Sequence, residues 1–394
     1  MAVRTWKLID RHSNLLRRAE QFSVQASDVG LGEGRFYALG HALQSGSSAG
    51  VDMLEISNGA ITVELLPTRG MGIRRAWSST PSGVAIFGWE SPVRGPVHPA
   101  LVDLGEPSGL GWLDGFDELL VRCGLESNGA PEFDETTGRL KYPLHGRIAN
   151  KPAHELTLTI DTDKEEITLV GVVEEARFHF LKLRLTTTMT LKLGSHQIAI
   201  RDEIENLSSA PAEAQMLYHV NFGLPLLDAG SQVMAPVKTL VPRNPHAASG
   251  LKSWNSYLAP QTGYEEMVYF LEMHGTEHSV TEVLLKNAHS TRGASLIYKT
   301  SELPCFSLWK DTGSAVDGYV TGLEPGTNYP NPRSFEGKHN RVMKLAPLEK
   351  KSLHLTLELH TTEKSIAAAE ARIAKLQAGK ETKIHDAPLA DWCA

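Results

Sequence analysis

The stretch "LKLRLTTTMTLKL", residues 181–193, decides the class of fold, because its apolar side chains recur at every second position. One face of this segment carries Leu181, Leu183, Leu185, Met189, Leu191 and Leu193. The other face carries Lys182, Arg184, Thr186, Thr188, Thr190 and Lys192. Side chains alternate between the two sides of a β-strand, so the pattern predicts a long strand buried on one side only.

The same alternation recurs at "HELTLTI" (154–160) and "SLHLTLEL" (352–359), and shorter β-rich runs occur at "AITVELLP", "EITLVGVV" and "ASLIYK". Breaks rich in glycine and proline separate these runs, and strands do not alternate with helices. The expected fold is therefore all-β, a large antiparallel sandwich. Helical periodicity is confined to the ends, at residues 365–379 and, for a shorter helix, at residues 10–22. The tail after Lys380 is expected to be loosely held.

Composition limits the classes of partner that this chain is expected to bind. Its 394 residues carry a net charge of −7 and no basic block, so no nucleic-acid footprint is present. The first residues lack the apolar run of a signal peptide, and no stretch reaches membrane-spanning length. Three widely spaced cysteines fit reduced thiols in a cytoplasmic protein better than a disulfide frame or a metal knuckle.

The pattern along the chain divides it into three parts. We expect an N-terminal extension with a short helix and leading strands over residues 1–50, a β-sandwich domain over residues 51–360, and a C-terminal helix and tail over residues 361–394. The oligomeric state stays open, because the terminal helix can pack on its own sandwich or on a neighbouring copy.

Four segments embed polar side chains among turn residues and aromatics. They are "LLPTRGMGI" (65–73) with Arg69, "YPLHGRIANKPA" (142–153) with His145, "QMLYHVNFGLPLL" (215–227) with His219 and Asn221, and "YVTGLEPGTNYPNP" (319–332) with Glu324. Strand alternation puts His219 and Asn221 on the same face, and a polar pair inside an apolar run needs partners or a wet cavity. Pro325 and Gly326 predict that a strand breaks into a loop at Glu324.

Together these motifs resemble the galactose mutarotase (aldose 1-epimerase) superfamily. Histidine in "LHG", histidine in "YHVNF" and glutamate in "GLEP" follow in the family's order and spacing, over roughly residues 50–360. "LPTRGMGI", "VRCGLESNGAPE" and "LWKD" are similar to an uncharacterised epimerase-like branch. The resemblance implies a β-supersandwich that binds a sugar in a groove, and an isomerase that interconverts sugar anomers.

The resemblance also implies roles for individual residues. Glu324 would be the general base for the anomeric hydroxyl, His219 the general acid for the ring oxygen, and His145 a hydrogen-bonding partner of the sugar. Arg69 and Asn221 would contribute to substrate binding. This proton-transfer chemistry requires no metal or other cofactor.

Arg122 and Lys310 are two further candidate substrate-binding residues. Each would either border the groove or form a structural ion pair. If both face the groove, an anionic or oxidised sugar is favoured over a neutral hexose.

Two other functions fit the same residues. One is a lyase or hydrolase that acts on a modified glycoside, keto or acidic, in which His145, His219 and Glu324 ligate a divalent metal. The other is a carbohydrate-binding protein without catalysis. In each case the expected partner is a small carbohydrate, and neither nucleic acid nor a membrane.

Overall fold

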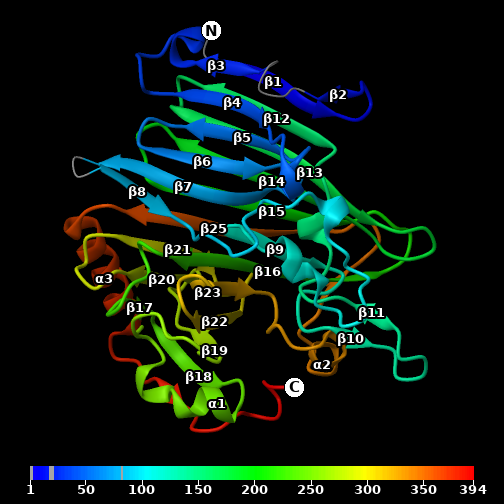
Figure 1. The fold of residues 1–394 in the computed structure, drawn as a ribbon, viewed down its shortest axis with the longest axis vertical. Helices are drawn as coiled ribbons and strands as arrows, with labels where there is room; N and C mark the ends of the chain where they lie inside the picture. The colour runs from blue at the N-terminus through cyan, green and yellow to red at the C-terminus, as the bar shows by residue number, and fades with distance from the viewer. Residues whose placement is uncertain (1–2, 17–21, 81–82) are drawn as a thin grey trace.

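The predicted sandwich is confirmed: two large, mostly antiparallel sheets pack face to face and enclose one continuous apolar core (Figure 1). This arrangement is seen in a computed structural model, which describes residues 3–16, 22–80 and 83–394. No helix within these residues combines the length and the apolar composition needed to cross a membrane.

The first sheet has ten strands among the described residues, and the stretch 181–193 lies at its centre. In spatial order its strands are β17 (Gln232–Met234), β20 (Val280–Lys286), β21 (Gly293–Lys299), β25 (Lys350–His360), β15 (Gln197–Asn206), β14 (Lys182–Lys192), β13 (Glu166–Ala176), β12 (Glu155–Asp161), β1 (Val3–Asp10) and β2 (Leu15–Leu16).

The second sheet has fourteen strands in the described part of the chain and carries His219 and Glu324 near its centre. Its order is β26 (Lys383–Ile384), β18 (Val237–Pro242), β19 (Met267–Met273), β22 (Cys305–Thr312), β23 (Tyr319–Gly326), β16 (Ala212–Gly223), β9 (Leu120–Leu125), β7 (Gly72–Thr80), β6 (Ile61–Leu66), β5 (Asp52–Ser57), β4 (Tyr37–Ala42) and β3 (Ser23–Gln25), with β24 (Met343–Leu345) paired to β16 and β8 (Gly83–Phe87) paired to β7.

The remaining elements are short. A separate hairpin joins β10 (Glu132–Phe133) and β11 (Leu140–Tyr142). The α-helices are α1 (Pro245–Ser249), α2 (Arg333–Lys338) and α3 (Glu363–Gln377). Single turns of 3₁₀-helix are η1 (Ala26–Val29), η2 (Gly46–Ser48), η3 (Pro99–Leu101), η4 (Gly111–Gly115), η5 (Ile148–Asn150) and η6 (Leu251–Ser253).

Strand β14 shows why alternation predicts this fold. Leu183, Leu185 and Leu191 are fully buried and point into the space between the sheets. Burial of a leucine side chain stabilises the fold by about 1.5–3 kcal/mol. A register slip by one residue would move all the apolar side chains of β14 to the outer face, and the burial energy of each would be lost. Thr187 shares the inner face and is also buried, and its hydroxyl donates a hydrogen bond to Asp202 of β15 at 2.7 Å.

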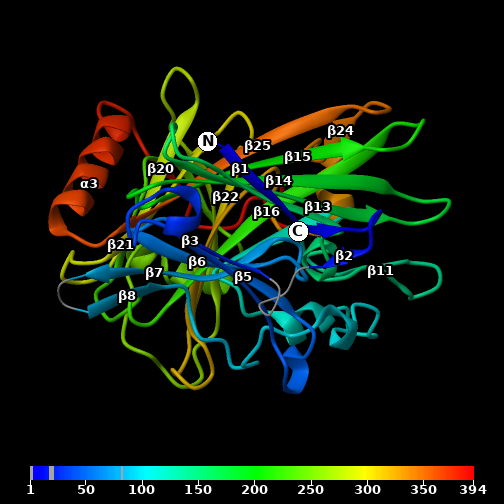
Figure 2. The same ribbon diagram turned by 90° about the horizontal axis from the view of Figure 1, so that it is seen from above.

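The C-terminal helix is confirmed, and it lies at one side of the sandwich (Figure 2). Ile366, Ala369 and Ile373 of α3 pack against Leu284 of β20, which is the apolar stripe that the sequence pattern predicts. Thr362 caps the helix by accepting a hydrogen bond from the backbone N–H of Ser365.

The expected helix at residues 10–22 is wrong where the structure describes this segment. Strand β1 extends to Asp10, a turn follows, and Leu15 and Leu16 form β2 against β1. The Asp10 carboxylate accepts the backbone N–H of His12 at 3.0 Å, so this side chain favours a turn over a helix. Residues 17–21 of the expected helix lie outside the described part of the chain.

The tail after Lys380 is held more firmly than expected. Strand β26 pairs with β18, and the Trp392 ring stacks on Tyr329 with 4.9 Å between ring centroids. Asn331 donates a side-chain hydrogen bond to the carbonyl of Trp392 at 2.8 Å. These contacts tie the C-terminus to the loop that follows β23.

Candidate active site

Two neighbouring strands bring His219 and Glu324 into contact. Strand β16 pairs with β23 at Leu217–Gly326 and at Val220–Leu323, and this register sets His219 opposite Glu324. Directly opposed residues of an antiparallel pair have Cβ atoms about 4.5–5.5 Å apart, so their side chains meet. His219 Nε2 lies 3.3 Å from Glu324 Oε1, and both side chains are almost completely buried.

The expectation that the strand ends at Glu324 is wrong, because β23 continues through Pro325 to Gly326. On one side Pro325 faces Phe306 of β22. On the other side, β16 and β23 are not paired at Glu324 and Pro325, although they are paired before and after them. Proline has no N–H to donate, so the ladder is interrupted here while both flanks hold the strand in place.

His145 reaches the same region from a turn packed against the end of β9. Its backbone N–H donates to Gly129 O at 2.9 Å, and its carbonyl accepts the N–H of Gly124 at 3.1 Å. His145 and Gly146 both have positive φ, 55° and 73°. A Cβ on Gly146 would lie 2.0 Å from the carbonyl oxygen of Ser127, so only glycine fits after the histidine.

The three residues that sequence analysis assigned to catalysis line one cavity of about 330 Å³. Its walls are largely aromatic and aliphatic, as is typical of small-molecule sites. The lining residues are Leu110, Trp112, Leu113, Phe116, Ala130, Pro131, Leu144, His145, His219, Arg243, Glu266, Val268, Trp309, Glu324 and Pro330.

Hydrogen bonds fix the proton positions on both histidines. Asn221 uses its amide N–H groups for the carbonyls of Glu118 (2.9 Å) and His219 (3.3 Å), so its Oδ1 accepts the Nδ1–H of His219 at 2.6 Å. His145 Nδ1–H donates to the carbonyl of Asn128 at 2.9 Å. In the neutral ring each histidine therefore keeps a lone pair on Nε2, and that of His219 faces Glu324.

Burial favours the neutral forms of all three groups. It raises the pKa of Glu324 well above the usual range of a carboxylic acid, an effect increased by the charge of Glu266. It lowers the pKa of His219 well below that of a free imidazole, and it lowers the pKa of His145 to about 4. In these forms Glu324 carries a carboxyl proton and His219 Nε2 keeps its lone pair, and the two groups lie 3.3 Å apart. Within the described residues Glu324 Oε1 has no hydrogen-bond partner.

Arg69 and Arg122 do not line this cavity. The Arg69 guanidinium forms an ion pair with Glu118 at 2.5 Å, and it also donates to the carbonyls of Val97 and Gly115. Arg122 forms an ion pair with Asp202 at 2.5 Å and donates to the carbonyl of Met71. Both arginine side chains are 1% exposed, so their donors are used within the protein.

Lys310 and Asn221 also lie behind the cavity wall. The Lys310 ammonium donates to the carbonyls of Ser253 and Ser256, each at 2.8 Å, and lies over the ring of Tyr257. Asn221 is confirmed on the same strand face as His219, opposite the core residues Tyr218 and Val220. Its amide orients the His219 ring and does not line the cavity itself.

The aromatic walls of the cavity were not predicted from the sequence. Trp112, Phe116 and Trp309 surround the two histidines, with ring centroids 4.6 Å apart for Trp112–His145, 5.1 Å for Phe116–His219 and 5.4 Å for His219–Trp309. The Trp309 indole N–H donates to Glu266 at 2.7 Å at the cavity rim. Trp309 stands in the "LWKD" motif, which carried the family resemblance without pointing to a role.

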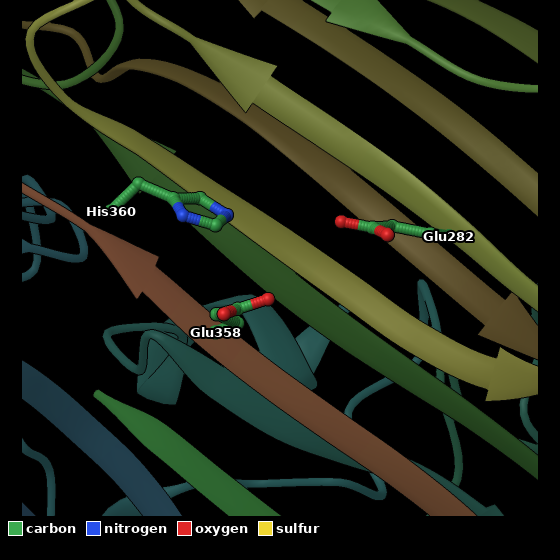
Figure 3. Close-up of side chains that lie close together, drawn as sticks. All are labelled: Glu282, Glu358 and His360. Carbon is green, nitrogen blue, oxygen red and sulfur yellow. The ribbon is translucent and has the colours of Figure 1, made fainter. Parts of the chain in front are cut away.

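Within the described ranges, one group of three side chains brings potential metal ligands within 4.8 Å of one another: Glu282, Glu358 and His360 (Figure 3). Arg372 of α3 donates to Glu282 at 2.6 and 2.8 Å and to Glu358 at 2.7 Å, so one guanidinium already binds both carboxylates and balances one of their two negative charges. The group therefore fastens α3 to the sheet.

The alternative metal ligands considered from the sequence, His145, His219 and Glu324, do not form such a group among the described residues. Only His219 and Glu324 touch directly through side-chain ligand atoms. This arrangement suits proton exchange between two groups better than three-ligand coordination.

Comparison with known families supports the resemblance seen in the sequence. A family described as a domain of unknown function (DUF4432) matches residues 48–359. The fold is similar to that of a Klebsiella pneumoniae protein provisionally assigned as an aldose 1-epimerase, with a TM-score of 0.93 and 33% sequence identity over 98% of this chain and 99% of that chain. None of the curated proteins matches this sequence.

More distant solved structures share the fold. A galactose mutarotase-like protein from Clostridium acetobutylicum has a TM-score of 0.57 at 12% identity, over 83% of this chain and 99% of its own. An Escherichia coli K12 protein, provisionally assigned as an aldose 1-epimerase, has a TM-score of 0.51 at 12% identity, over 78% of this chain and 99% of its own.

Proposed function

The chain belongs to the DUF4432 family, and from this premise and its cavity we propose that it is an aldose 1-epimerase-like enzyme that interconverts the anomers of a free sugar. The observation that carries the proposal is the 3.3 Å contact between His219 Nε2 and Glu324 Oε1 in an aromatic cavity of about 330 Å³. A volume of this size is at the lower end for small-ligand sites and fits a monosaccharide.

The pair acts as one bifunctional acid–base unit. Opening a hemiacetal ring requires a proton to leave the anomeric hydroxyl while another proton reaches the ring oxygen. From the neutral pair, the Glu324 carboxylic acid gives its proton to the ring oxygen, and His219 Nε2 takes the proton of the anomeric hydroxyl. The ring C–O bond breaks, and an open-chain aldehyde faces a Glu324 carboxylate and a His219 imidazolium.

Ring closure reverses both transfers on the other face of the carbonyl. Rotation about the bond between the first two carbons presents that face to the hydroxyl at the former ring position. Glu324 then removes the proton of this hydroxyl, and His219 protonates the carbonyl oxygen as the new anomeric hydroxyl forms. The pair returns to its starting state, so Glu324 is the acid in ring opening and the base in ring closure. These roles are the reverse of those implied by the family resemblance, because burial favours a protonated Glu324 and a neutral His219.

The surrounding side chains would bind the sugar. Trp112, Phe116 and Trp309 offer ring faces on which the C–H surface of a pyranose can pack. The free Nε2 of His145 can accept a hydrogen bond from a sugar hydroxyl, because its other nitrogen is occupied by Asn128. These groups hold the anomeric centre beside the pair of His219 and Glu324.

A neutral sugar fits this cavity better than an acidic one. The cations suggested from the sequence, Arg69, Arg122 and Lys310, are used in buried contacts away from it. Arg243 does line the cavity, but its guanidinium lies 3.6 Å from the Glu266 carboxylate, which also lines the cavity. A substrate carboxylate would meet no unpaired cation among the described lining residues.

Polarimetry on a panel of freshly dissolved aldoses tests the proposal. We expect accelerated approach to the anomeric equilibrium for at least one neutral aldose, and a rate lowered about 10²–10⁴-fold in Glu324→Gln. Glu272→Gln, which changes a half-exposed carboxylate on β19, is the matched control and should keep full activity. Full activity of a folded Glu324→Gln protein would remove Glu324 from the mechanism.

A further inference from the structure

A second cavity, of about 370 Å³, lies beside the candidate active site. Its walls come from the segment that contains η5, from the end of β13 and from the turn after β13. Leu144 and His145 line the catalytic cavity, while Arg147 and Lys151, a few residues further along the same segment, line this one. One short stretch of chain therefore contributes to both cavities.

Three cations border this second cavity: Arg147, Lys151 and Arg177. Within the described part of the chain, the side chains of Arg147 and Lys151 form no hydrogen bond or ion pair, whereas their backbone N–H groups are held by Gly124 and Ile148. Arg177 lies over the ring of Phe180 at 4.3 Å. Two carboxyl groups, Glu126 and Glu175, line the same cavity, so the cations are in excess by one even when both carboxyl groups are ionised. An excess of cations creates a positive potential that attracts an anion.

A buried carboxyl group forms part of the cavity wall. Glu175 is 5% exposed, and its Oε2 accepts the backbone N–H of Leu125 at 2.8 Å. Its Oε1 is buried and has no hydrogen-bond partner within the described residues. Leaving a buried polar atom unpaired is unfavourable, so this oxygen marks a place where a ligand atom can complete a hydrogen bond.

The protonation state of Glu175 fits an anionic ligand. The pKa of Glu175 is raised to about 7, mainly by burial and also by the charge of Glu126. The Leu125 N–H and the charges of Arg147 and Lys151 act in the opposite direction. Since Oε2 is occupied by Leu125, the proton belongs on Oε1, where it can be donated to an acceptor in the cavity.

We infer that this cavity is a binding site for a small organic anion with a carboxylate or phosphate group. The anionic group would take hydrogen bonds from Arg147 and Lys151, and Oε1 of Glu175 would donate to one of its oxygens. Phe180 would cover the apolar part of the ligand, since this side chain lines the cavity and is 59% exposed.

Binding of an anion here is expected to depend on pH with a definite sign. The charged groups that face Glu175 are Glu126, Arg147 and Lys151, with Arg177 across the cavity. A bound anion disfavours ionisation of Glu175, so binding takes up a proton when the pH is at or above about 7. Affinity should therefore rise as the pH falls through this value.

Titration calorimetry with four probes tests the inference: inorganic phosphate, glucose 6-phosphate, glucuronate and neutral glucose. We expect one of the three anions to bind, and its affinity to fall about tenfold or more in Arg147→Met/Lys151→Met. Arg139→Met/Lys252→Met removes the same charge from two exposed positions and should leave binding unchanged. If no anion binds, or if the first double variant binds as well as the control, the inference fails.

Two further variants separate this site from the catalytic cavity and test the proton. Trp309→Ala alters the catalytic cavity only, so loss of anion binding in this variant would place the anion there and overturn the inference. Glu175→Gln cannot release a proton, so glucuronate affinity in this variant should become independent of pH between about pH 6 and pH 8. Glucuronate is the probe for this comparison because phosphate titrates in the same range.

Discussion

At the scale of single residues, a buried position in the sheet shifts the pKa values of His219 and Glu324 towards their neutral forms. His219 and Glu324 are cross-strand neighbours, and neither can reach bulk water, because both side chains are about 3–5% exposed. Asn221 fixes the ring orientation and the tautomer of His219, because its Oδ1 accepts the hydrogen bond of His219 Nδ1–H. Burial therefore favours the neutral acid and the neutral imidazole over a solvated ion pair.

The two residues of this pair should not contribute independently. Glu324→Gln and His219→Gln should each lower kcat/KM by about 10²–10⁴-fold, since loss of either partner leaves the other without its proton exchange. The double variant should be little worse than the worse single variant. Polarimetry measures the rates, and circular dichroism checks the fold; a double variant whose losses multiply would mean that the residues act separately.

The pH dependence of activity should be broad. The active form has one proton in the pair and a neutral His145, whose pKa is about 4. Activity is expected to fall on the acid side as imidazoles become charged, and on the alkaline side as Glu324 loses its proton at a pKa raised by burial. Above about pH 5, kcat/KM should be nearly constant until Glu324 ionises, after subtraction of the spontaneous rate. A drop centred near pH 6.5 would indicate an unshifted histidine instead.

At the scale of elements, buried ion pairs fasten the two sheets to each other. Arg122 lies on β9 of the fourteen-stranded sheet, and Asp202 lies on β15 of the ten-stranded sheet. Their side chains meet across the interior with 2.5 Å between Arg122 Nε and Asp202 Oδ2. Arg122 follows directly on Val121, which pairs with His219, so this contact also fixes the strand next to His219.

Removing one partner of this contact should destabilise the protein. Arg122→Met leaves Asp202 buried without its counter-ion, at an expected cost of about 3–5 kcal/mol. Arg201→Met, which breaks a half-exposed pair with Glu203 on the same strand as Asp202, should cost less than about 1 kcal/mol. Urea denaturation compares the two variants. An equal and small effect of both would show that the buried pair contributes no more than a surface pair.

At the scale of the whole molecule, the C-terminal segment supports the cavity wall. Trp392 stacks on Tyr329, and both pack in a cluster with Val268 and Trp309, which line the cavity. The carbonyl of Asp391 accepts a hydrogen bond from Arg341 at 2.8 Å. The C-terminal residues therefore stand behind an aromatic wall of the candidate active site, although they do not line it.

Loss of the Trp392 ring should weaken both stability and activity. Trp392→Ala removes a stacked, partly buried ring and is expected to cost about 1–3 kcal/mol, while Trp392→Phe should recover most of this. The melting temperature and the polarimetric KM report the two effects, and KM should rise because Trp309 loses its support. A variant with an unchanged melting temperature would show that the tail is only loosely attached.

The all-β fold and the C-terminal helix could be predicted from local sequence patterns, and the family resemblance pointed to the three residues that meet in the cavity. Alternation in β14 and helical spacing in α3 are local patterns that depend on burial of one face, so they can be read from one segment at a time. The site residues were reached through motif resemblance and through the polar positions His219 and Asn221 within an apolar strand.

Which charged residues face the cavity could not be predicted from the sequence and is known from the tertiary structure alone. Arg69, Arg122 and Lys310 have strong hydrogen-bonding groups, but their partners come from segments far away in the chain. A sequence pattern contains no distances between such segments. For the same reason the aromatic walls and the direct contact between His219 and Glu324 emerged only from strand register, since burial and pairing depend on neighbours that folding brings together.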